Sequence, residues 1–179
     1  MLSDRHNHDG SSGNGPRVRL RDIIDAERFA FIPAGQFEET NANVALGQFN
    51  NFAVLSFTDG VSGVATVSFM LPATKKSISS IKILFNNRTA SSVLRLAYNF
   101  ERARLATTQA TDSLAEASYT TGATVNTLYE LEIPKTAWDG LLQLTPFDIL
   151  GLKITRSGAS ASDTYNAALE IYGLLIEFS

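Results

Sequence analysis

The sequence predicts an all-β fold, an antiparallel β-sandwich of the jelly-roll type with about eight strands. Apolar residues recur with a period of two along most of the chain, which is the period of a strand with one buried face. Turn residues interrupt these segments at intervals of about a dozen residues, a spacing typical of sandwiches and barrels. Lys and Glu are scarce beside Ser, Thr and Ala, so long exposed helices are not expected.

The expected strands follow one another from residue 29 onward. Residues 29–32 lead into a turn at Pro33, and the pair Asp59-Gly60 gives a hairpin signal after the first long strand. Pro72 ends the next strand, because proline cannot donate a backbone hydrogen bond to a sheet. The eight long strands are expected over residues 52–57, 64–71, 78–85, 93–100, 114–119, 128–133, 149–156 and 168–178.

Two connections between these strands have a predictable form. Residues 135–141 are expected to form one helical turn, since Pro134 precedes them and proline suits the first position of a helix. Residues 157–163 are small and polar and are expected to form a loop. No segment is long enough to supply helices that would cover a parallel sheet, so the sheets should be antiparallel.

Composition narrows the classes of partner. The net charge is -3, from 15 basic and 18 acidic residues, which gives little attraction to nucleic acid or to anionic lipid. The chain has no cysteine, so disulfides and thiolate metal sites are excluded. Residues 1–15 are polar and do not resemble a secretory signal. We therefore expect that neither nucleic acid nor a membrane is a partner. We also expect that the protein is made and assembled in a cytoplasm.

The chain is expected to divide into a flexible arm at residues 1–21 and a sandwich domain at residues 22–179. Residues 3–16 hold no large apolar residue and are rich in glycine and polar side chains, so they cannot bury enough surface to fold alone. The next five residues alternate basic and apolar side chains and are expected to dock on a partner. The basic side chains of this assembly arm are Arg17, Arg19 and Arg21.

The two histidines form the only histidine constellation, His6-x-His8. In an extended chain both imidazoles point to the same side. One chain offers two ligands, fewer than a closed zinc site needs, whereas three chains around an axis would offer an octahedral set for a transition metal. Asp9 is placed to orient one imidazole. The alternative is a solvated polar tail that binds no ion.

Catalysis has little support in the sequence. No histidine lies outside the arm, which leaves paired carboxylates as the route to acid–base chemistry. Glu130 and Glu132 share a strand face and Glu38-Glu39 are adjacent, but both pairs have the spacing of a solvent-facing strand. The expected protein is not an enzyme.

Trp138, the only tryptophan, is the candidate for contact with a glycan. A carbohydrate-binding platform would align it with Tyr129 or Tyr119, because sugar rings stack on exposed aromatic faces. The alternative is that Trp138 closes one end of the sandwich core.

Three aspartates lie in expected turns and would bind calcium if they converged. Turn capping explains them equally well without an ion. They are Asp59, Asp148 and Asp163.

Two stretches resemble tailed-bacteriophage virion proteins. The first is the leader Arg5-His6-Asn7-His8-Asp9-Gly10 with the basic–apolar segment at residues 17–20, similar to the His-Asn-His-Asp-Gly leader of many phage tail, fibre and baseplate-associated proteins. The second runs from residue 144 to 156 and from 162 to 165 before a long apolar last strand, and resembles the end of small phage jelly-roll modules. Together they cover about a third of the chain.

The resemblance implies a virion structural protein: a homotrimer that decorates a capsid or forms a head fibre or small tail component. It would dock on other virion proteins by its arm, with an iron ion held by His6 and His8 on the trimer axis. The chain has no long repetitive shaft, which favours a short standalone component of the virion over a full fibre. Two alternatives stay open: a carbohydrate-binding sandwich module, and a virion protein that binds host glycans.

Overall fold

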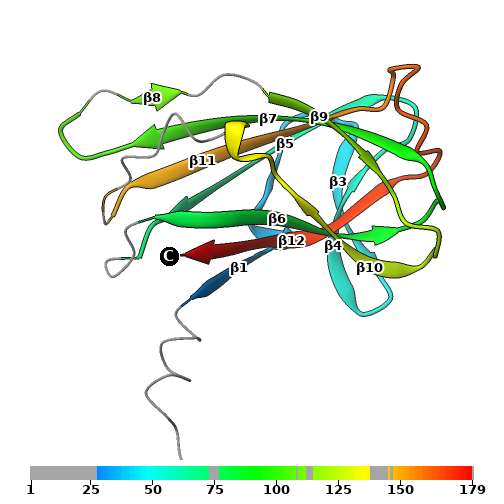
Figure 1. The fold of residues 1–179 in the computed structure, drawn as a ribbon, viewed down its shortest axis with the longest axis horizontal. Helices are drawn as coiled ribbons and strands as arrows, with labels where there is room; N and C mark the ends of the chain where they lie inside the picture. Colours follow the sequence, from blue (N-terminus) through cyan, green and yellow to red (C-terminus); the bar gives the residue numbers. More distant parts are fainter. Residues whose placement is uncertain are drawn as a thin grey trace, which may run out of the picture.

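A computed structural model describes residues 28–72, 77–107, 109–111, 115–137, 145 and 147–178. Twelve strands in these residues form two antiparallel sheets that pack face to face (Figure 1). The predicted arm at residues 1–21 and the first residues of the predicted domain lie outside the described part. No helix in the described ranges has the length and apolar character needed to cross a membrane.

The first sheet has the strand order β10-β6-β12-β4-β3. A further strand, β1, pairs with β12 beyond the point where β4 ends, so β4 and β1 share one edge of β12. The strands of this sheet are β1 (Phe29–Pro33), β3 (Val44–Phe49), β4 (Phe52–Phe57), β6 (Ile78–Asn87), β10 (Thr127–Glu132) and β12 (Leu169–Phe178).

The second sheet has the order β2-β5-β11-β7-β8, and β9 also pairs with β7. Two short 3₁₀ helices are described, Ala34–Gln36 and Lys135–Ala137. The strands of this sheet are β2 (Glu38–Glu39), β5 (Ser62–Met70), β7 (Val93–Ala103), β8 (Ala110–Thr111), β9 (Ala115–Thr120) and β11 (Ile149–Ser157).

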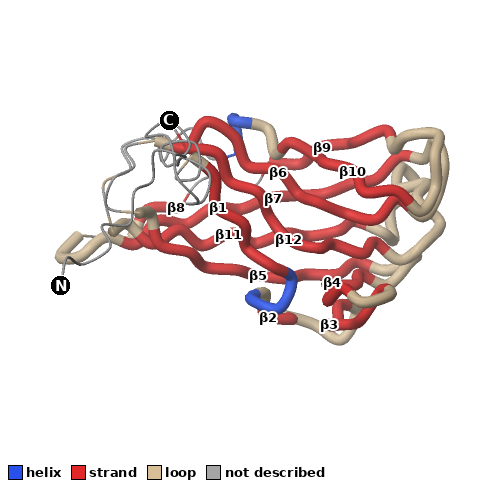
Figure 2. Tube along the Cα trace, turned by 90° about the horizontal axis from the view of Figure 1, so that it is seen from below, coloured by secondary structure: helices blue, strands red, loops and turns tan. Residues whose placement is uncertain are grey.

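Eight of these strands make a jelly roll. They stand in the order β4-β12-β6-β10 in one sheet and β5-β11-β7-β9 in the other, and the chain crosses between sheets at most connections. Figure 2 shows the strands, in red, running along the length of the molecule. This is the double Greek key that defines the fold. The predicted fold class is therefore confirmed, and each of the eight predicted strands matches one of these eight. The helical turn was predicted over residues 135–141; residues 135–137 form the 3₁₀ helix Lys135–Ala137, and residues 138–141 lie outside the described part of the chain.

The additional strands were not predicted. β3 has the sequence Val-Ala-Leu-Gly-Gln-Phe and only its first residue is buried, so it lacks the alternation that marks a half-buried strand. β2 and β8 have two residues each, too few to show any period. These strands form because the jelly-roll strands beside them offer an edge to pair with.

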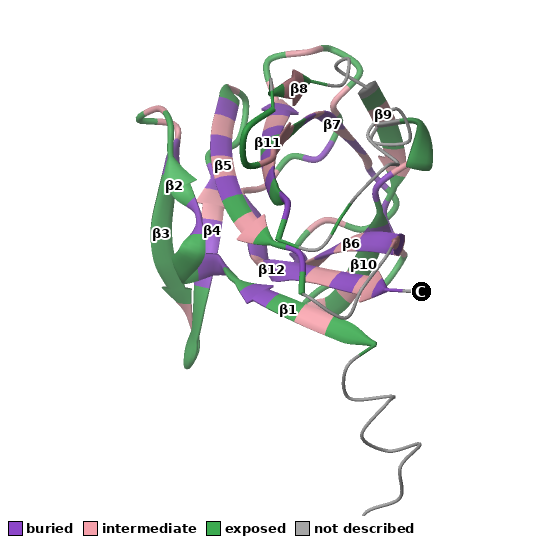
Figure 3. Cartoon of the chain, turned by 90° about the vertical axis from the view of Figure 1, so that its left-hand side faces the viewer, coloured by how far each residue is buried: buried purple, intermediate pink, exposed green. Residues whose placement is uncertain are grey.

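The core lies between the sheets and follows the predicted alternation. In β7, Leu94, Leu96, Tyr98 and Phe100 have no exposed surface, and the residues between them point outward. Figure 3 shows the same alternation of buried and more exposed positions along β5. Burying one such large side chain contributes about 1.5–3 kcal/mol, so the inward rows of the two sheets stabilise the sandwich.

Candidate functional site

The outer face of the first sheet carries a cluster of exposed apolar side chains, which we call the aromatic face. Its members come from five strands, β1, β4, β6, β10 and β12, and surround a hollow of about 350 Å³. Phe31, Phe52 and Leu128 are 53%, 61% and 64% exposed. The members of the aromatic face are Phe31, Phe52, Leu84, Leu128 and Tyr172.

Strand register places these side chains outside the sandwich. Phe31 lies opposite Leu175, and the next residue, Ile32, points into the core. Leu128 lies opposite Asn86, and Tyr129 after it packs against the core. An antiparallel sheet with one solvated face normally carries polar residues at the outward positions. This sheet instead has apolar side chains on both faces, and the exposed apolar cluster is a candidate interaction site.

Three ion pairs lie beside the aromatic face on the same sheet, so cations and anions stand next to each other there. The Lys82 ammonium donates a hydrogen bond to Glu130 at 2.8 Å, and this bond raises the pKa of Lys82. Lys82 and Glu130 lie in β6 and β10, whereas Arg28 and Arg88 lie just outside β1 and β6 and pair with glutamates of β12. The pairs are Arg28 with Glu177, Lys82 with Glu130, and Arg88 with Glu170.

The rings of the aromatic face do not form a flat platform. Phe52 and Tyr172 meet edge to face, with ring centroids 5.6 Å apart and an interplanar angle of 84°. A sugar stacks on an exposed ring face, whereas perpendicular rings make the packed contacts common between protein side chains. The arrangement therefore suits a protein surface better than a saccharide.

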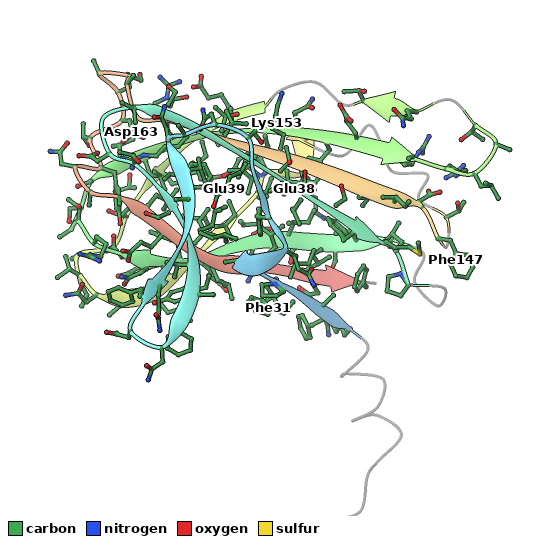
Figure 4. All side chains as sticks on the ribbon, turned by 180° about the vertical axis from the view of Figure 1, so that it is seen from behind. Phe31, Glu38, Glu39, Phe147, Lys153 and Asp163 are labelled. Carbon is green, nitrogen blue, oxygen red and sulfur yellow. The ribbon has the colours of Figure 1, made fainter. Side chains whose placement is uncertain are left out.

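The outer face of the second sheet carries a different feature, a shallow groove of about 170 Å³ that we call the polar groove. Figure 4 shows Lys153 and Glu38 on this side of the molecule and Phe31 on the other. The side chains and the glycine along the groove are Thr66, Ser68, Asn99, Glu101, Gly151 and Lys153.

The three turn aspartates do not converge, so they cannot share a calcium ion. Asp59 and Asp163 both accept hydrogen bonds from Arg156, at 3.2 and 3.3 Å. Asp148 precedes β11 while Arg156 lies near its end, and eight residues of extended strand separate them by roughly 25 Å. Figure 4 shows Asp163 and Phe147, the neighbour of Asp148, at opposite ends of the molecule. The described residues contain no group of three possible metal ligands.

Asp148 is held at its end of the sandwich by Arg104. The Arg104 Nε and one terminal nitrogen each donate to a carboxylate oxygen at 2.7 Å, the bidentate geometry of a strong ion pair. The guanidinium, together with the N–H and hydroxyl of Thr145, lowers the pKa of Asp148 to about 2. This group is a structural anchor of the turn before β11.

The glycan platform predicted around Trp138 is not formed by its two tyrosine candidates. Tyr119 and Tyr129 are half-buried and pack against the core. The Tyr98 hydroxyl donates a hydrogen bond to the Tyr119 hydroxyl at 2.9 Å, and burial raises the pKa of Tyr98 and of Tyr119. Tyr129 packs instead beside Phe85, with centroids 6.1 Å apart.

The other predicted site residues lie outside the described residues. The structure therefore gives no contact for the predicted metal pair, the assembly arm or the tryptophan. These residues are His6, His8, Arg17, Arg19, Arg21 and Trp138.

The paired carboxylates stand on the surface. Glu130 and Glu132 are both exposed on β10, and Glu130 is held by Lys82. Glu38 and Glu39 are exposed on β2, and the Glu39 carboxylate accepts a hydrogen bond from the backbone N–H of Leu46. All four carboxylates are exposed to solvent, the surface position that their spacing predicted.

The aromatic face is not among the sites that the sequence predicted. The signal was present in β1, where Phe29 and Phe31 occupy one side of the strand and Ile32 the other. A short strand with large apolar residues on both sides indicates two buried faces. In this molecule one of those faces is exposed.

The comparisons with known proteins give a fold likeness only. No family model matches the chain, and no curated protein matches it. Among solved structures it is similar to a CBM35 from Paenibacillus barcinonensis, with 10% identity, a TM-score of 0.47, and coverage of 84% of this chain and 98% of that one. It is also similar to a family 35 carbohydrate-binding module from Clostridium thermocellum, with 13% identity, a TM-score of 0.48, and coverage of 83% of this chain and 96% of that one. The third is the xylan-binding module CBM15, with 15% identity, a TM-score of 0.45, and coverage of 84% of this chain and 96% of that one. All three scores are below 0.5, so the jelly-roll assignment rests on the strand order itself.

Proposed function

We propose that this chain is a non-enzymatic structural subunit of a phage virion that associates with further copies of itself through the aromatic face. The observation that carries the proposal is the exposure of Phe31, Phe52 and Leu128 around one hollow on the outer face of the first sheet. Burial of each of these side chains by a partner would contribute about 1.5–3 kcal/mol to the free energy of association. A surface of this kind is expected to be covered in the working molecule.

A second copy of this chain is the partner that the surrounding charges favour. The aromatic face is flanked by ion pairs that present cations and anions together, as in Lys82 with Glu130. Two such surfaces related by rotation can place opposite charges against each other, whereas a surface of one sign would repel its copy. The predicted trimer is one closed form of such an assembly.

The virion setting is supported by the leader at residues 5–10, which resembles that of phage structural proteins. In this proposal the arm at residues 1–21 docks on other virion proteins, and the sandwich associates with neighbouring copies. Docking by a short polar arm and by a broad sandwich face would act together, because the first contact raises the effective concentration of the second.

Glycan binding is the second candidate function. The observation that favours it is the polar groove on the second sheet, where hydroxyl, amide and charged side chains adjoin a glycine. The two functions use different sheets and do not exclude each other.

The test is the native mass of the full-length protein, measured by light scattering over a range of concentrations. We expect an oligomer in the wild type and a shift to monomer in Phe52→Glu, since a buried phenylalanine contributes about 1.5–3 kcal/mol and a buried unpaired carboxylate costs more. Phe52 is 61% exposed in the single chain, so the change should not disturb the fold of the subunit.

Leu105→Glu is the matched control. Leu105 is also a large exposed apolar residue, 95% exposed, but it lies beyond the end of β7 in the other sheet. Its replacement should leave the mass unchanged. A full-length protein that stays monomeric at the highest concentration, or a Phe52→Glu variant that remains oligomeric, would refute association through the aromatic face.

A further inference from the structure

The polar groove crosses the three central strands of the second sheet, β5, β11 and β7. Its side chains stand in two rows set by the strand register. In one row Lys153 lies between Thr66 and Asn99, and in the other Gly151 lies between Ser68 and Glu101. Adjacent strands are about 4.8 Å apart, so each row spans roughly 10 Å. The groove is thus a strip of polar groups across the sheet.

Gly151 forms the floor of the second row, and packing does not explain it. A Cβ at this position would lie 3.8 Å from Glu101 Cβ and 3.9 Å from Ser68 Oγ, which are ordinary contact distances. Its backbone is not in the left-handed region that favours glycine. Glycine weakens the interior of a strand, and there it often marks a place where a ligand approaches the backbone closely.

The side chains around Gly151 offer both donors and acceptors. The Lys153 ammonium donates, the Glu101 carboxylate accepts, and the hydroxyls of Thr66 and Ser68 do both. In the described residues none of these four side chains has a hydrogen bond or ion pair. Their hydrogen-bonding capacity is therefore available to a ligand that lies over Gly151.

We propose that the polar groove binds a neutral oligosaccharide, with one sugar ring seated on the bare backbone of Gly151; this inference rests on glycan binding, the second candidate function. Sugar hydroxyls both donate and accept, which matches the mixed groups of the groove. The charges of Lys153 and Glu101 offset each other, and Glu38, opposite Thr66 on β2, adds a carboxylate that disfavours acidic glycans. None of the described residues that line the groove is aromatic, so the affinity should be modest, in the millimolar range.

The test is titration calorimetry and NMR of the full-length protein with soluble linear oligosaccharides of xylose, glucose and galactose, with oligogalacturonate as the acidic probe. We expect one or more neutral oligosaccharides to bind, and Gly151→Ala to weaken that binding by about tenfold, because the added methyl group lifts the sugar off the floor. Lys153→Met should weaken it as well by removing a donor.

Two control variants show whether the sugar binds in the polar groove. Gly47→Ala adds the same methyl group to β3 of the other sheet, where the new Cβ would lie 4.0 Å from Val54 Cγ2, and it should bind as the wild type does. Phe52→Glu should also bind normally, so a failure of self-association would not be mistaken for a failure of glycan binding. Neither Gly151→Ala nor Gly47→Ala should lower the melting temperature, because the added Cβ meets only atoms at ordinary contact distance. An unchanged melting temperature would show that each variant is folded.

Three results would overturn the inference. The first is that no neutral oligosaccharide binds the wild type. The second is that Gly151→Ala binds with undiminished affinity, which would place the ligand elsewhere on the molecule. The third is preferential binding of oligogalacturonate, which would contradict the neutral ligand class.

Discussion

At the scale of single residues, Arg156 shows how one charged side chain can organise an end of the sandwich. It stands at an inward position of β11 and has no exposed surface. Its guanidinium donates to the carbonyls of Tyr165 and Ala167 and to two carboxylates, Asp59 and Asp163. A buried cation is tolerated only with such complete pairing. The two turns that carry the aspartates are thereby tied to one strand.

Removing this guanidinium should be strongly destabilising. Arg156→Met leaves the Asp163 carboxylate, whose side chain is 1% exposed, buried without its partner. Breaking a buried pair in this way costs about 3–5 kcal/mol of unfolding free energy, measurable by urea denaturation. The double variant Arg156→Met with Asp163→Asn should regain part of the loss, since the unpaired charge is gone. A single variant within about 1 kcal/mol of wild type would show that the cluster is not needed.

Asp148 gives a pH-dependent prediction. Arg104 and Thr145 lower its pKa from 3.8 to about 2 in the folded protein, so the ionised form favours folding. The contribution, about 2 kcal/mol, is fully present above about pH 5 and is lost as the pH falls towards about 2. Asp148→Asn should therefore be less stable than wild type at neutral pH, and the difference should shrink through this acid range. The unfolding free energies of both proteins measured against pH check this, and a constant difference would contradict it.

At the scale of elements, β1 depends on a glycine in its neighbour. Gly173 lies opposite Pro33 where β12 changes register, and a Cβ there would lie 2.2 Å from the Ile32 carbonyl oxygen and 2.8 Å from the Phe31 ring. The bare glycine lets β1 pair closely and lets Phe31 lie over the strand. The aromatic face is thus partly a consequence of one missing side chain.

Gly173→Ala should separate β1 from β12. Its φ of 156° adds strain to the clash, and overpacking of this kind costs about 1–3 kcal/mol. We expect faster hydrogen exchange of the β1 amides and a lower unfolding free energy. Gly47→Ala is the control, because its Cβ meets no atom closer than 4.0 Å. Unchanged hydrogen exchange of the β1 amides would show that β12 accommodates the added methyl group without weakening its pairing with β1.

At the scale of the whole molecule, the sandwich presents two outer faces of opposite character. The first sheet exposes Phe31, Phe52 and Leu128, and the second exposes the groove over Gly151. Because the sheets are packed back to back, a partner on one face leaves the other free (Figure 4). Association of copies by the aromatic face would therefore display several polar grooves outward, and weak binding at each would add through multivalency.

The fold class and the positions of the eight jelly-roll strands follow from local patterns in the amino-acid sequence. The period-two pattern is local, and side chains that alternate between core and solvent reveal it along one strand at a time. It also placed Glu130 and Glu132 on a solvent-facing strand. β3 was not predicted, because only one of its residues is buried and its sequence therefore shows no alternation of buried and exposed positions.

Which residues from distant strands meet depends on how the sheets are assembled. The aromatic face joins residues from Phe31 to Tyr172, and the polar groove joins residues from Thr66 to Lys153; both depend on the strand order, which no local pattern encodes. The same holds for Asp59 and Asp163, which turn chemistry placed in loops but which only the jelly-roll topology brings to Arg156. Alternation fixes the side of a strand on which a residue lies, whereas the packing of distant strands decides whether that side is covered.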